Sequence, residues 1–156
     1  MIQRKQTLYL LLSGLLMLLP LFLPILMVGD TAGGAFYDMN ASGFLSPDGS
    51  GTLVYPAWFL FALDLLIILL SFIAIFLYNK RTLQMRMTMF NLLLKVGFYG
   101  LVAYYAFSHK GDFGSAAELS IRVWLAAPIL GTILDYLAHR AIAIDDRTIR
   151  FMDRLR

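Results

Sequence analysis

The chain has 156 residues, of which 60% are hydrophobic, and it carries a net charge of +3. Soluble domains contain about 45–50% apolar residues, so this composition indicates a membrane protein and leaves little chain for a separate soluble domain. The absence of cysteine excludes disulfides, thiolate catalysis and iron–sulfur sites. We therefore expect one integral membrane domain over residues 1–156.

Four apolar segments approach or exceed the roughly 20 residues that a helix needs to cross a bilayer. They predict helices over residues 8–28, 53–78, 89–107 and 121–144. The predicted fold class is therefore all-α, a four-helix transmembrane bundle. The first segment is longer than the apolar core of a secretory signal peptide, which has about 7–15 residues, so we expect it to be a permanent helix.

The first two predicted helices are joined by residues 29–52, which are rich in glycine, aspartate and serine. We expect this segment to form a loop on the outer side of the membrane. Within it, Ser46-Pro-Asp-Gly49 predicts a turn. A short β-hairpin in the same segment is an alternative. Pro20 and Pro24 are expected to kink the first helix and to free carbonyls that neighbouring helices satisfy.

A basic elbow, residues 75–87, connects the second and third predicted helices and carries Lys80, Arg81 and Arg86. In the third helix, Gly97 and Gly100 share a face where they would permit close contact with another helix.

The distribution of lysine and arginine predicts the orientation of the chain. Ten of the 13 basic residues lie on one side of a four-crossing arrangement: near the N-terminus, in the elbow and after the last apolar segment. The positive-inside rule therefore places both termini and the elbow in the cytoplasm. Residues 145–156 are predicted to extend the last helix into the cytoplasm.

Three stretches of the sequence carry a family likeness: the opening MIQRKQTLYL, the elbow stretch IFLYNKRTLQMR, and the close, AHRAI followed by DRLR. Together they resemble the family called domain of unknown function 4293, small four-helix membrane proteins from Bacteroidota. The resemblance spans nearly the whole chain and constrains residues 29–52 least. It implies a location in the inner membrane of a Gram-negative cell, and it implies no activity.

Ionisable side chains within the predicted helices are the sharpest chemical feature. A charge at the bilayer centre costs about 2.5–3.5 kcal/mol, so such a residue needs a partner or a function. At about 1.5 Å per residue, Lys95 and Asp135 lie within roughly 5 Å of the same depth, which predicts an ion pair. Asp64 lies roughly 10 Å closer to the outer side, and we expect it to be protonated and hydrogen-bonded. The candidate intramembrane polar site comprises Asp64, Asn91, Lys95, Asp135 and His139.

Two interpretations of this polar site compete. In the first, Lys95 and Asp135 form a packing pair and Asp64 is a neutral donor to a neighbouring helix or subunit. In the second, the three residues line a proton or ion path. We favour packing, because four helices leave little room for a gated path and the sequence shows no internal repeat of the kind that transporters use.

The second candidate site is basic and lies at the predicted cytoplasmic ends of the helices. It comprises Lys80, Arg81, Arg86, Arg140, Arg147, Arg150, Arg154 and Arg156. One interpretation is a C-terminal helix that lies on anionic lipid headgroups. The other is a helix that docks onto a cytoplasmic or membrane partner, because arginine and aromatic residues favour interfaces.

We expect no catalytic, cofactor or metal site. His109 and His139 fall on opposite sides of the predicted membrane, and the sequence has no phosphate-binding loop or nucleophile elbow. The predicted function is that of a non-enzymatic accessory or assembly subunit in a bacterial inner membrane. The alternative is a minimal transporter or channel that uses Asp64, Lys95 and Asp135. The expected partners are anionic lipids, other membrane proteins or further copies of the chain, and not nucleic acid.

Overall fold

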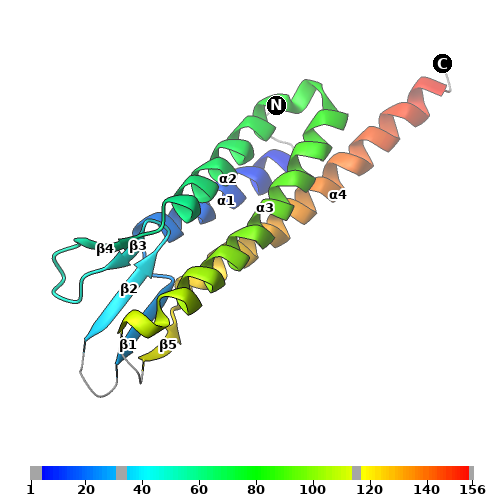
Figure 1. Ribbon diagram of the computed structural model, residues 1–156. Helices are drawn as coiled ribbons and strands as arrows, with labels where there is room; N and C mark the ends of the chain where they lie inside the picture. The colour runs from blue at the N-terminus through cyan, green and yellow to red at the C-terminus, as the bar shows by residue number, and fades with distance from the viewer. Residues whose placement is uncertain (1–4, 31–34, 114–116, 155–156) are drawn as a thin grey trace.

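The computed structural model describes residues 5–30, 35–113 and 117–154, and these form a helical bundle with a β-sheet at one end (Figure 1). The described α-helices are α1 (Lys5–Phe22), α2 (Trp58–Phe76), α3 (Arg81–Ser108) and α4 (Ala126–Arg154). The described strands are β1 (Leu26–Asp30), β2 (Phe36–Asn40), β3 (Gly43–Leu45), β4 (Leu53–Pro56) and β5 (Ala117–Ile121).

The helices run up and down around a common core. Helix α1 packs against α2 and α4, and α3 packs against the same two helices. The start of α1, the turn between α2 and α3, and the C-terminal part of α4 lie at one end of the molecule, which we call the elbow end (Figure 1). The sheet lies at the opposite end, which we call the sheet end.

The chain is mostly helical and has the four predicted helices, but the fold is not all-α, because five strands form an antiparallel sheet with the order β4-β3-β2-β1-β5. The predicted outer loop, residues 29–52, holds β2 and β3, so the hairpin alternative was the better one. Asn40 shapes the turn between these strands, because its side-chain oxygen accepts hydrogen bonds from the N–H groups of Ser42 (2.9 Å) and Gly43 (3.2 Å). The predicted turn at Pro47 and Asp48 is present, and a hydrogen bond from Ser46 lowers the pKa of Asp48.

The first helix ends at Phe22 and not at residue 28, because Pro24 has no N–H to continue it. The carbonyl of Pro20 accepts the N–H of Ala41 at 2.8 Å, and the Asn40 side chain donates to the carbonyl of Leu21 at 3.4 Å. The chain then enters β1. The carbonyls at the helix end are therefore satisfied by the turn between β2 and β3, and not by a neighbouring helix as predicted.

Three other predicted boundaries are also wrong. Residues 53–56 and residue 121 belong to strands β4 and β5, so the second and fourth helices begin later, at Trp58 and Ala126. The third helix begins at Arg81, eight residues earlier than predicted, because the elbow sequence after Lys80 contains no glycine or proline to break it. The reversal itself takes only the short 3-10 helix η1 (Leu77–Asn79) and Lys80.

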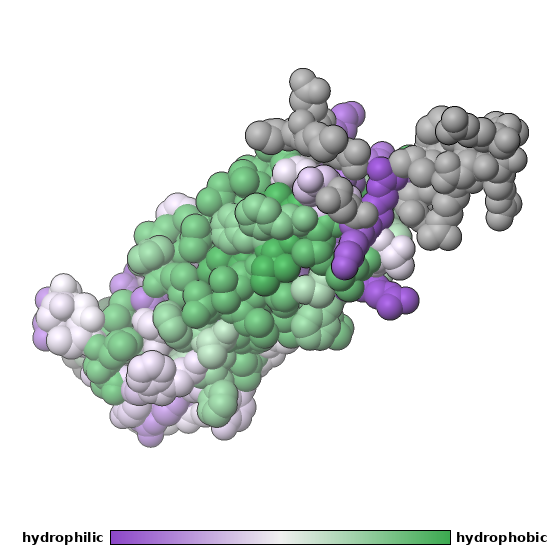
Figure 2. Space-filling model, turned by 90° about the horizontal axis from the view of Figure 1, so that it is seen from above, coloured by the Kyte–Doolittle hydropathy of each residue, from purple (hydrophilic) through white to green (hydrophobic). Residues whose placement is uncertain are grey.

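Helices α1, α2 and α3 are long and apolar enough to cross a membrane. Large hydrophobic side chains are exposed along the bundle, and Figure 2 shows them covering the middle of the visible face, with hydrophilic residues toward both ends. The sheet adds Val28, Met39 and Phe44 to a buried apolar cluster that includes Leu60 and Phe98 from α2 and α3. The sheet and the sheet-end halves of these helices therefore share one core.

The predicted close contact at Gly97 and Gly100 is absent from the described structure. Both glycines are exposed, and a Cβ at either would have no described neighbour within 4 Å. Two other glycines lie at the helix contacts. A Cβ at Gly14 would lie 3.2 Å from the Ser71 Cβ, and one at Gly131 would lie 3.2 Å from the Lys95 ammonium.

Candidate functional site

Lys95 and Asp135 form a buried ion pair near the middle of the bundle. The Lys95 Nζ lies 2.7 Å from the Asp135 Oδ2, and neither side chain is exposed. The contact expected from their depth is therefore present. Lys95 also donates a hydrogen bond to the Ser13 hydroxyl, which in turn donates to the carbonyl of Gly131 at 3.1 Å. The absence of a side chain at Gly131 leaves room for the ammonium group.

Asn91 extends this pair into a network. Its amide nitrogen lies 2.8 Å from the Ser71 hydroxyl and 3.2 Å from the Asp135 Oδ2. The Ser71 hydroxyl donates to the carbonyl of Ile67, one turn back on α2, at 3.0 Å. Because Ser13 belongs to α1, the network connects all four helices. We call Ser13, Ser71, Asn91, Lys95 and Asp135 the polar clamp.

Sequence reasoning missed the two serines as members of this site. Serine is common on membrane helices, and neither residue is ionisable, so neither stands out by composition. The available signal was local: Ser13 is followed by Gly14 on a helix otherwise rich in leucine, which is typical of a close helix contact. The structure places Gly14 directly against Ser71.

Asp64 is separate from the polar clamp. It is fully buried on α2, and neither of its carboxyl oxygens has a hydrogen-bond partner among the described residues. The predicted hydrogen bond to a neighbouring helix is therefore not seen. Leu60 and Ile67, one turn to either side on α2, are also fully buried, so the neighbours of Asp64 along its own helix are apolar. The charge of Lys95 on α3 also acts on Asp64, but without a hydrogen bond.

His139 is not brought into the polar clamp either. It follows Asp135 by one turn on α4, but its buried Nδ1 atom has no partner in the described part of the chain. Three other buried polar residues toward the elbow end were missed from the sequence, Gln6, Gln84 and Thr88. The Gln84 amide donates to the carbonyl of Ala74 at 2.9 Å and so ties α3 to α2 beside the elbow.

The basic candidate site is at the elbow end. Lys80, Arg86 and Arg140 are exposed there, and the half-buried Arg81 donates to the carbonyl of Asp145 at 3.3 Å. The structure describes the positions of Arg147, Arg150 and Arg154 within α4 but not their side chains, and Arg156 lies outside the described residues.

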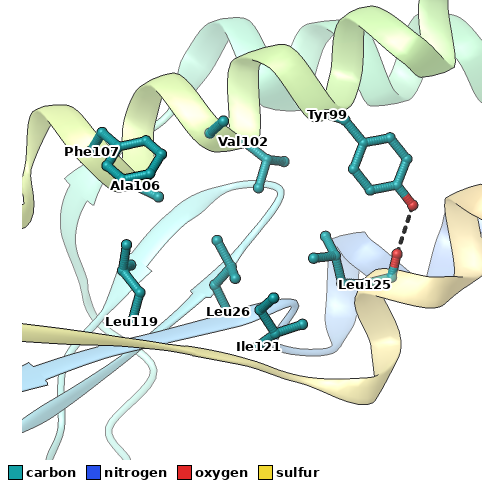
Figure 3. Close-up of a pocket in the computed structure, with 9 residues that line it drawn as sticks. Leu26, Tyr99, Val102, Ala106, Phe107, Leu119, Ile121 and Leu125 are labelled. Atoms are coloured by element: carbon teal, nitrogen blue, oxygen red, sulfur yellow. Dashed lines mark hydrogen bonds between the residues drawn. The ribbon is translucent and has the colours of Figure 1, made fainter.

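An apolar pocket lies between α3 and the inner face of the sheet, with a volume of about 270 Å³. Figure 3 shows Leu26, Leu119 and Ile121 pointing from β1 and β5 toward Val102 and Phe107 on α3. At one end, the Tyr99 hydroxyl donates to the carbonyl of Leu125 at 2.6 Å. The pocket could not be found from the sequence because one of its walls is the sheet.

His109 belongs to an aromatic cluster at the sheet end. Its ring stacks on Tyr55 and Tyr105, with centroid distances of 4.8 and 6.3 Å, and its Nδ1 lies 2.9 Å from the Asp112 carboxylate. Within the described residues, no group of three or more histidine, cysteine or acidic side chains could hold a metal ion.

Comparison with known proteins agrees with the likeness seen in the sequence. No match was found among curated proteins. A family model described as "Domain of unknown function (DUF4293)" matches residues 2–155, which is essentially the whole chain. The chain therefore belongs to the DUF4293 family.

Proposed function

We propose that the protein is a multi-pass protein of a bacterial inner membrane, with four crossings and with both termini and the elbow in the cytoplasm. The three apolar helices and the exposed hydrophobic belt support membrane insertion. The orientation is supported by the basic side chains at the elbow end, because lysine and arginine near helix ends favour the cytoplasmic side.

Within that membrane, we infer a non-enzymatic accessory or assembly role in which the C-terminal part of α4 docks onto a partner. One observation carries this inference. Helix α4 continues without a break to Arg154, and in Figure 1 it projects straight beyond the elbow instead of bending across the bundle end. A helix that lies on headgroups would have to turn into the plane of the membrane. From Asp145, which Arg81 contacts, to Arg154 the helix extends by about 14 Å.

Truncation after Asp145 tests this role and keeps the contact with Arg81. We expect the truncated protein to stay folded in the membrane and to lose a defined complex that the full chain forms in mild detergent. A matched variant with Arg147, Arg150 and Arg154 changed to glutamine keeps the helix and removes its charge. An unchanged complex in both variants, together with weaker binding to vesicles of anionic lipid, would instead support the headgroup interpretation.

The second candidate function is a minimal transporter or channel. The observation that favours it is the buried Asp64 without a described partner, because unpaired carboxyl groups in membrane helices mark ion and proton pathways. Purified protein in liposomes with a pH-sensitive dye inside tests it. Proton flux that is present in the wild type and lost in Asp64→Asn would support transport, and equal flux in both would argue against it.

A further inference from the structure

The buried interior holds two carboxyl groups and one ammonium group. Asp64, Lys95 and Asp135 are fully buried, and Lys95 is the one buried lysine or arginine among the described residues. If all three were ionised, the interior would carry a net charge of −1. An isolated buried charge is very costly in an apolar medium, and groups in this situation neutralise instead.

The hydrogen bonds show which carboxyl group takes the ammonium. Lys95 donates to Asp135 at 2.7 Å and to Ser13, and Asn91 adds a second hydrogen bond to the same Asp135 oxygen. Asp64 receives no described hydrogen bond. The ionised form of Asp135 is therefore stabilised by a direct ion pair and hydrogen bonds, whereas ionised Asp64 would have only the more distant attraction of Lys95, without a hydrogen bond.

Apart from Lys95, the buried residues described on the other three helices include no cation. The buried residues of α1 are uncharged, and the buried charged residues of α3 and α4 are Lys95 and Asp135. His139 lies one turn beyond Asp135 toward the elbow end, and the Tyr99 hydroxyl, one turn from Lys95 toward the sheet end, donates to the carbonyl of Leu125. We propose that Asp64 is a proton-binding site, and that its carboxyl group is held in the protonated form inside the bundle.

The position of Asp64 along α2 indicates from which end of the bundle a proton has the shorter route to it. Asp64 is six residues from Trp58, the first residue of α2, and so lies about 9 Å from the sheet end of that helix. Ser71, which bonds to Asn91, is seven residues further toward the elbow, or about 10 Å. The polar clamp therefore lies between Asp64 and the elbow end, so the shorter route for a proton to Asp64 is from the sheet end.

Labelling of the purified full chain with dicyclohexylcarbodiimide tests the proposal, because this lipophilic reagent modifies protonated carboxyl groups in apolar surroundings. We expect a mass adduct on Asp64 that increases toward acid pH, no comparable adduct on Asp135, and loss of the adduct in Asp64→Asn. Infrared spectroscopy gives an independent measurement. The wild type should show a carboxylic-acid C=O band that Asp64→Asn lacks.

The proposal is overturned if neither the adduct nor the infrared band is found, or if Asp135 is labelled as readily as Asp64. An adduct that forms on Asp64 and not comparably on Asp135 supports it, and so does the Asp64-dependent band when Asp135 is not labelled as readily as Asp64. The inference deepens the second candidate function without requiring transport. If Asp64 is protonated but the protein moves no protons, the proton-binding site is supported and the transporter function is excluded.

Discussion

The ion pair in the polar clamp makes a quantitative prediction about stability. Lys95→Met removes the ammonium and leaves the Asp135 carboxylate buried. Lys95→Met combined with Asp135→Leu removes both charges and fills the same space with apolar groups. If the pair serves to compensate charge, the single variant should be strongly destabilised and the double variant should recover most of the loss.

The magnitude follows from the contacts of Asp135. Removing one partner of a buried ion pair costs about 3–5 kcal/mol, because the other charge is left uncompensated. In Lys95→Met, the Asn91 amide still donates to the Asp135 oxygen at 3.2 Å, and a hydrogen bond to a charged group is worth about 1.5–3 kcal/mol. We therefore expect the lower end of the range, about 3 kcal/mol. The double variant should unfold within about 1 kcal/mol of the wild type, because apolar replacement of a whole pair is often neutral.

Unfolding in mixed micelles with increasing sodium dodecyl sulfate, followed by circular dichroism, measures these differences. Val96→Met is the matched control, because it introduces the same side chain at the next position, which is 58% exposed. It should change the free energy of unfolding by less than about 0.5 kcal/mol. Equal destabilisation of the single and double variants would refute the reasoning, since it would show that packing around Lys95 matters and charge compensation does not.

Three further variants test the close contacts by the same unfolding assay. Gly131→Leu should lower the free energy of unfolding by about 2 kcal/mol or more, because its Cβ would lie 3.2 Å from the Lys95 ammonium group. Gly97→Leu is the matched control and should be neutral or stabilising, because nothing described lies within 4 Å of its Cβ. Gly43→Ala should lower the free energy of unfolding more than Gly49→Ala does. Both glycines have a positive φ, 140° at Gly43 and 71° at Gly49, but only at Gly43 would the Cβ overlap a backbone carbonyl, that of Tyr55. Asn40→Ala should cost about 2 kcal/mol and make the sheet end more sensitive to protease, because it removes a helix-end contact and two turn hydrogen bonds.

The centre of the bundle could be predicted from the sequence because it depends on local regularities. A helix advances by a fixed rise, so the distances of Lys95 and Asp135 from the helix ends were enough to predict their contact. The number of helices followed from the apolar segments in the same way. The small errors at the elbow come from the basic residues, which were assigned to a connector although they are good helix formers.

The sheet could not be predicted from the sequence in the same way, because its strands pair with segments far away in the chain. Leu26, Met27 and Val28 are as apolar as the helix before them, and the one clear sign that the helix stops is Pro24. The partner of β1 on one side is β5, with Leu26 opposite Ile121, almost 100 residues further along the chain. No pattern within either segment specifies that pairing.

Helix α4 is less apolar than the other three helices. Its exposed face nevertheless fits the proposed fourth crossing. Asp135, one of the polar residues of α4, is fully buried against Lys95, so it lowers the hydropathy of the helix without facing lipid. The exposed side chains on the same turns are apolar or aromatic: Ile129, Leu130, Ile133 and Tyr136. A lipid bilayer contacts the outer face of a packed helix and not its mean composition, so the burial of Asp135 in the polar clamp removes this charge from the face of α4 that lipid would contact. Asp64 differs from Asp135 in its contacts: it is equally hidden from lipid, but no described group forms a hydrogen bond with its carboxyl oxygens.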